Sequence, residues 1–384
     1  MLHVAKEVHG FDVAFAALMA DGNNGDSVGG NPFSALAHWG FGTLTGVLTE
    51  EEHFCRWVEA ETRFAKKKAA KIFAAADAWN DKELLSTLKQ INPSAASASG
   101  GEGGEEVLLP LGVQEVCALV IEYIDMSRVF PRSDSRNVFL NAVLRVLLKA
   151  MLRKLSWRVE SYDAYGEGAR YQSIQATVGS LASLSCFESV VLDPCLYCQH
   201  TGDLQVCKQF EQEVVTMVKK WTIKLTRLVV GIFEKGTSAY SKRLEGLCED
   251  GEEGAYEAKA MFCTVLQDVD EEICAIRAKV PSDMFRRVWT SIAASICTSM
   301  FDVASASVRT RLQATTFRES CHQLVEMFRN YTKRPDAYFK LVLEACEILC
   351  MEDGPMLQLE HQVAGNDKEV LESAGFVAMT PSQV

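Results

Sequence analysis

The sequence predicts an all-α protein made of consecutive antiparallel helical bundles. Apolar residues recur at three- and four-residue steps in one segment after another, which is the spacing of a single helical face. No stretch shows the sustained polar–apolar alternation of a half-buried strand. Proline is scarce, with 9 among 384 residues, and much of the apolar content is Ala, Leu, Val and Met. Both facts favour helix over sheet.

The composition narrows the classes of function. With 48% apolar and 23% charged residues, the chain is typical of a globular protein of about two or three domains. A net charge of −12 argues against nucleic acid as a partner, and the basic run Lys66–Lys68 is interpreted as a solvated helix face. We find no run of ~18 apolar residues and no signal-peptide pattern, so neither a membrane span nor secretion is expected. The 13 cysteines indicate reduced, mostly buried thiols in the cytosol.

Helices separated by turn-rich breaks are expected in the first half of the chain. Thr49 precedes three glutamates and is a typical helix start, and the apolar face that follows it continues to Trp79. The segment Asn92–Glu106, NPSAASASGGEGGEE, has the composition of a flexible linker. Further helices are expected over residues 1–18, 113–129, 135–159 and 173–192.

The second half contains the longest helical pattern. An apolar stripe runs through Lys208–Leu244, and Glu249–Gly254 then interrupts the helix. Another helix follows as far as Pro281, where Pro281-Ser282-Asp283 is expected to end it and to cap the next.

A helical hairpin is expected near the C-terminus. Residues 317–331 carry one apolar face, and Pro335 disfavours helix at the residue before it. A second face follows, and two amphipathic helices joined by so short a turn should pack together. That second face carries Tyr338, Phe339, Val342, Cys346 and Leu349.

These patterns suggest a division into five parts. We expect a first helical bundle over residues 1–92, a flexible linker or loop over 93–106, a middle bundle over 107–250, a C-terminal bundle over 251–365, and a short helix and tail over 366–384.

The strongest metal-like pattern is a group of cysteines. Cys195 and Cys198 have the spacing with which two thiolates chelate one Zn²⁺. Cys186, His200 and Cys207 lie nearby, but no second tight Cys or His pair follows. Buried thiols beside a loop are therefore the favoured interpretation, with structural zinc as the alternative.

Catalytic patterns are weak. Asp268, Asp270, Glu271 and Glu272 resemble a Mg²⁺-binding acidic helix only loosely, and they alternate with apolar residues as a solvated face would. We find neither a phosphate-binding loop nor a nucleophile elbow. The sequence therefore predicts no catalytic, cofactor-binding or metal-binding residues.

Four sequence blocks carry a family resemblance. The last of them is Tyr331-x-Lys333-Arg334-Pro335-x-x-Tyr338-Phe339-Lys340, followed by Glu344-Ala345-Cys346 and Leu349. The earlier blocks are Phe11-Asp12 at the end of the first helix, Phe54-x-x-Trp57-Val58-x-x-Glu61 with Ala78-Trp79, and Arg136-x-x-Phe139-Leu140. In this order they resemble the RINT/TIP family of vesicle-tethering subunits, and the chain resembles the C-terminal half of its longer members.

The resemblance implies a non-enzymatic protein without cofactors. It implies an elongated rod of stacked helical bundles, as in exocyst, COG and GARP subunits, on the cytosolic face of the endoplasmic reticulum (ER). The implied partners are ER SNAREs and other subunits of the Dsl/NRZ tethering complex, which receives COPI vesicles from the Golgi. Membrane association would be peripheral and indirect, through these partners.

The motif residues are interpreted as structural rather than catalytic. They are Trp57, Glu61, Trp79, Phe139, Tyr331, Lys333, Arg334, Pro335, Tyr338 and Phe339. Alternative functions are a helical scaffold outside trafficking, such as a checkpoint adaptor, and a metal-dependent all-α enzyme.

Overall fold

The prediction of an all-α protein is confirmed. A computed structural model describes residues 13–14, 51–83, 108–128, 130, 133–162, 170–192, 205–363, 368–373, 375–380 and 383. About 11 α-helices hold most of these residues, and 86% of the described chain is helical. The predicted linker over 93–106, the cap Thr49 and the predicted helix over 1–18, apart from residues 13–14, lie outside the described residues.

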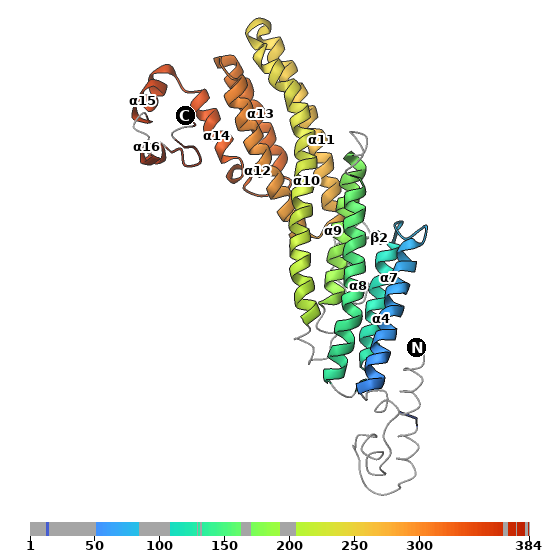
Figure 1. Ribbon diagram of the computed structural model, residues 1–384. Coiled ribbons are helices and arrows are strands. Elements are labelled where there is room, and N and C mark those ends of the chain that lie inside the picture. Colours follow the sequence, from blue (N-terminus) through green and yellow to red (C-terminus); the bar gives the residue numbers. More distant parts are fainter. Residues whose placement is uncertain are drawn as a thin grey trace, which may run out of the picture. The chain divides into compact units, whose positions relative to one another are not determined.

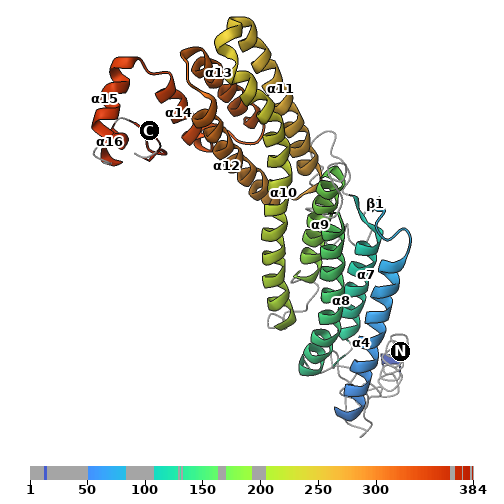
Figure 2. The ribbon, with the colours of Figure 1, turned by 45° about the horizontal axis from the view of Figure 1, so that its top comes forward.

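The chain divides into two compact units, Met1–Met217 and Val218–Val384. The division falls within one long helix, α10 (Gln205–Glu245), coloured yellow-green in Figures 1 and 2. The five-part organisation expected from composition stays a prediction.

Four of the described helices lie wholly within the first unit, and α8 (Ser133–Ser161) contacts the other three. These are α4 (Glu51–Ala74), α7 (Leu111–Ser127) and α9 (Arg170–Val191), which lie side by side with α8 in Figure 1. Because α8 is covered on several sides, apolar side chains occupy more than one of its faces. Its buried residues are Phe139, Leu140, Val143, Leu144, Leu147, Leu148, Met151, Leu152, Leu155 and Val159.

A short strand pair closes one end of this unit. Strand β1 (Asp81–Glu83) pairs antiparallel with β2 (Leu108–Pro110), and the Gln114 amide donates to Lys82 O and Leu109 O, both at 2.9 Å. The sequence shows no sign of this strand pair, because three residues are too few to show an alternating pattern. The helix expected to reach Trp79 ends at Ala74 instead, and residues 75–80 form turns.

The second unit contains the rest of the described helices. The hydrophobic face of α11 (Leu247–Lys279) packs on α13 (Arg311–Phe328), while α14 (Lys340–Leu349) contacts both α12 (Ser282–Ser307) and α13. The predicted hairpin is therefore present as α13, a 3₁₀ turn η2 (Pro335–Ala337) and α14. Tyr338 and Phe339 lie just before α14, not on its helical face.

Two predicted boundaries differ in detail. The interruption expected over Glu249–Gly254 appears as a kink at Gly251, where φ is +61°. At the start of α12 the N-cap residue is Pro281, without a side-chain cap bond, so Ser282 and Asp283 do not cap this helix. The capping box lies instead at α13, between Thr310 and Gln313.

The C-terminal region holds two further helices, α15 (Asp353–Val363) and α16 (Lys368–Ser373). The latter agrees with the short final helix predicted from the sequence, whereas α15 was not predicted.

One described helix, α9, is long and apolar enough to cross a membrane by length and composition. However, 72% of its most apolar window is buried, as in the core helix of a globular unit. Two of its buried hydroxyls bond within the helix: Thr177 donates to Ser173 O at 2.7 Å and Ser183 to Gly179 O at 2.6 Å. Burial within the first unit therefore accounts for its apolar character.

Candidate functional site

Residues from two of the sequence blocks meet in the first unit. Trp57 on α4 stacks on Phe139 of α8, with ring centroids 5.4 Å apart and an interplanar angle of 21°. Phe130 packs against both, at 5.1 Å from Trp57 and 5.2 Å from Phe139. Tyr123 of α7 lies 6.1 Å from Phe139. These four rings join α4, α7 and α8 in one aromatic cluster.

Glu61 is a carboxylate buried beside this cluster. Only 1% of the residue is exposed, and it accepts hydrogen bonds from Trp57 Nε1 at 3.3 Å and from the Tyr123 hydroxyl at 3.4 Å. Burial raises the pKa of the Glu61 carboxyl, and the two hydrogen bonds oppose this shift. Burial and the nearby Glu61 also raise the pKa of Tyr123. The arrangement holds Trp57 and Tyr123 in place.

Trp79 lies apart from this cluster. It stacks on Phe73 at 5.5 Å, and the Arg158 guanidinium lies 5.0 Å from its ring centroid. Burial lowers the pKa of Arg158, whose Nη1 is buried without a hydrogen-bond partner. This is a cation–π contact that fixes the turn after α4 against α8.

Arg136, from the same block as Phe139, binds the end of α7. It donates from Nε to Ser127 O at 3.2 Å and from Nη2 to Phe130 O at 3.0 Å. Carbonyl groups at a helix C-terminus have no partner within the helix, so a cation there satisfies them.

A second aromatic cluster surrounds the turn between α13 and α14. Phe328 contacts Phe339 at 4.9 Å and Tyr331 at 5.9 Å, and Trp289 of α12 contacts Tyr338 at 4.9 Å. Pro335 is buried at the start of η2. Aromatic side chains therefore pack on both sides of the turn between α13 and α14.

Tyr331 adds a polar contact to this cluster. Its hydroxyl donates to Asp270 Oδ1 of α11 at 2.5 Å and lies 3.2 Å from Cys274 Sγ. Burial and these two partners raise the pKa of Tyr331. Asp270, considered above as part of a weak acidic motif, therefore has a structural partner.

Lys333 and Arg334 are exposed members of the last block, as is Lys340 at the start of α14. They lie on the turn itself, while the aromatic residues on either side of them pack inward.

Sequence reasoning assigned no role to Glu344, although it lies in the last block. Its carboxylate is buried, with 5% of the residue exposed, and accepts bonds from three backbone N–H groups near the C-terminus. Lys340, one helical turn before it, forms an ion pair with this carboxylate at 3.6 Å. Nothing in the local pattern identified the distant backbone that surrounds it.

Metal-ligating side chains do not converge in the described part of the chain, where no group of three or more His, Cys, Asp or Glu residues could hold a metal ion. Cys195 and Cys198 fall outside that part. Cys186 is buried and lies against Cys117, whose thiol pKa is raised by the Cys186 thiol and by burial.

No protein-family model matches this chain, and no solved structure matches it significantly.

Proposed function

We propose that the chain is a non-enzymatic subunit of an ER tethering complex that acts in retrograde transport of COPI vesicles from the Golgi. It would bind ER SNAREs and other tether subunits through helix–helix contacts. Its membrane association would be peripheral, through those partners.

The observation that carries the proposal is the ordered set of sequence blocks together with the contacts between their residues. Trp57 and Phe139 belong to different blocks, yet their rings stack at 5.4 Å. Tyr331 and Phe339, within the last block, both pack on Phe328. Residues of these blocks therefore pack together in the core of each unit, as the structural role proposed for them requires.

The burial of the motif residues supports a structural role for them. Glu61, Phe139 and Phe339 are buried among apolar side chains, where no substrate can reach them. Residues buried in this way stabilise the packing of helices, and a tether needs packed helices as a scaffold for its partners.

Affinity purification from an extract of cytosol and ER membranes tests this function. The tag belongs on the N-terminus, because residues near the C-terminus pack into the second unit. We expect ER SNAREs and tether subunits to be recovered with the chain. Recovery of neither class would refute the proposal, and recovery of checkpoint proteins alone would favour the scaffold alternative.

Two charge-reversal variants locate the partner surface. Lys333→Glu with Arg334→Glu changes the exposed turn of the second unit, and Lys66→Glu with Lys67→Glu is the matched control on α4. All four side chains are exposed, so the fold should tolerate both variants. Loss of partners with the first variant alone would put the contact at this turn.

A further inference from the structure

The chain's own C-terminal segment binds α14 as a peptide ligand would. Val377 and Ala378 donate backbone N–H bonds to Glu344 Oε1 at 2.9 and 3.1 Å. Ala378 and Met379 donate to Oε2 at 2.8 and 3.0 Å. Three consecutive N–H groups thus surround one carboxylate, an arrangement that typically binds anions.

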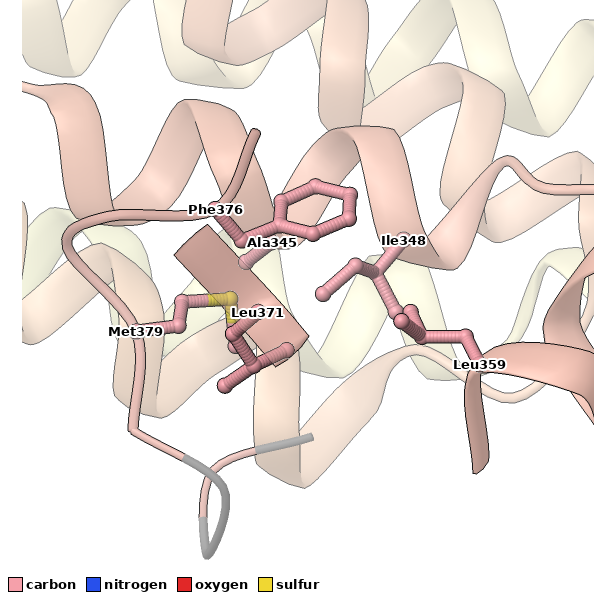
Figure 3. Close-up of a cluster of buried hydrophobic side chains, with 6 residues drawn as sticks. All are labelled: Ala345, Ile348, Leu359, Leu371, Phe376 and Met379. Atoms are coloured by element: carbon pink, nitrogen blue, oxygen red, sulfur yellow. The ribbon is translucent and has the colours of Figure 1, made fainter. Parts of the chain in front are cut away.

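Apolar side chains flank these hydrogen bonds. Phe376 and Met379 are buried, 3% and 2% exposed, whereas Val377 between them is 49% exposed. Figure 3 shows the Phe376 ring against Ala345 of α14, with Met379 beside Leu371. Ile348 and Leu359 complete the cluster.

The contacts define what this surface recognises. Two apolar side chains three residues apart enter the cluster, and the main chain between them supplies N–H groups to a buried carboxylate. Hydrogen bonds to a carboxylate are stronger than those between neutral groups, and the bend at Ala378 lets three consecutive N–H groups reach the same carboxylate. The side chains of Val377 and Ala378 are exposed, so they add little selectivity.

Few contacts hold this segment on α14. They are the four hydrogen bonds to Glu344 and the two buried side chains of Phe376 and Met379. Parts of a protein with few buried apolar contacts open at a lower free-energy cost than its core.

We propose that the α14 surface around Glu344 is a recognition site for a short peptide of a partner protein that bends as residues 376–379 do, and that residues 376–379 occupy it in competition with that partner. The partner segment carries an aromatic residue and, three positions later, a second apolar residue. The two residues between them and the second apolar residue each have a free backbone N–H group. This site does not depend on the pathway proposed above.

Binding of a synthetic peptide to the full chain tests the site. The probe is a fluorescent peptide of residues 371–384, and the variant Phe376→Ala with Met379→Ala weakens the chain's own segment. Fluorescence anisotropy should show the probe binding this variant at least about tenfold more tightly than the natural chain, because the competing segment is held less tightly. Should the double variant fail to fold, Met379→Ala alone takes its place.

Two controls separate recognition from nonspecific adhesion. Adding Glu344→Gln to the opened variant should weaken probe binding at least about tenfold, since the charged acceptor is lost. A probe with an N-methyl group on the residue equivalent to Ala378 lacks the donor that bonds both carboxylate oxygens, and it should bind as weakly.

Equal binding of the probe to the opened variant and the natural chain would overturn the proposal, and so would equal binding of the N-methylated probe. Either result would leave residues 376–379 as a fixed part of the fold.

Discussion

Replacing Gly236 by alanine tests how closely α10 and α11 pack in the second unit. A Cβ atom built at Gly236 would overlap Val265 Cγ2, would lie 2.9 Å from Val265 Cγ1 and would lie 3.2 Å from its Cβ. Carbon atoms in contact normally lie about 3.5–4.0 Å apart. Val265 is buried and β-branched, so it cannot rotate freely to make room.

The expected magnitude follows from two opposing effects. Alanine is about 1 kcal/mol more favourable than glycine inside a helix. Overpacking a well-packed core costs about 1–3 kcal/mol, and the overlap with Val265 puts this site at the upper end. We therefore expect Gly236→Ala to lower the free energy of unfolding by about 1–2 kcal/mol.

Gly231 provides a matched control on the same helix, because nothing lies within 4 Å of a Cβ atom built there. Gly231→Ala should raise the free energy of unfolding by about 0.5–1 kcal/mol. Urea unfolding followed by circular dichroism measures both variants, as shifts of midpoint at constant slope. Adding Val265→Ala should turn the effect of Gly236→Ala from destabilising to stabilising. A Gly236→Ala chain as stable as Gly231→Ala would refute the close approach of the two helices.

Three further predictions concern polar contacts. Folding raises the pKa of Glu61, so its protonated form contributes stability that is complete below about pH 4 and is lost as pH rises through the folded-state pKa. Glu61→Gln should therefore stabilise the chain, relative to the natural chain, increasingly as pH rises. A stability difference that does not vary with pH in urea titrations would contradict this. Tyr331→Phe keeps the ring but removes the donor to Asp270 and should cost about 1–2 kcal/mol in the same assay, whereas an unchanged midpoint would mean that water replaces this bond. Thr310→Ala should cost about 1 kcal/mol and Thr310→Ser much less, because only serine retains the capping box with Gln313; equal losses would argue against the cap.

The sequence alone determined the fold class and most helix positions. Helices α8, α9 and α10 begin and end within a few residues of their predicted limits, because long apolar periodicity is a local property that survives any tertiary arrangement. The break near Gly251 was also visible, since glycine marks positions that helices avoid.

Tertiary structure decided which residues meet and which face of a helix is covered. Phe64 continues the apolar face of α4 in sequence, yet it is 52% exposed, because burial depends on a neighbouring helix that periodicity does not reveal. The stacking of Trp57 on Phe139 likewise brings together two segments 82 positions apart in the numbering.

The carboxylate of Glu344 shows the same limit most clearly. In sequence it is one acidic residue on an amphipathic helix, for which a solvated position is the ordinary expectation. In the structure it is buried, and the backbone of residues 377–379 supplies its hydrogen bonds. Every residue but proline carries a backbone N–H donor, so no pattern of side chains in the sequence identifies which backbone segment will bind a carboxylate. The apolar periodicity of the sequence determined where the helices of this protein lie. Only the tertiary structure brings the backbone of residues 377–379 to Glu344 and so forms the site.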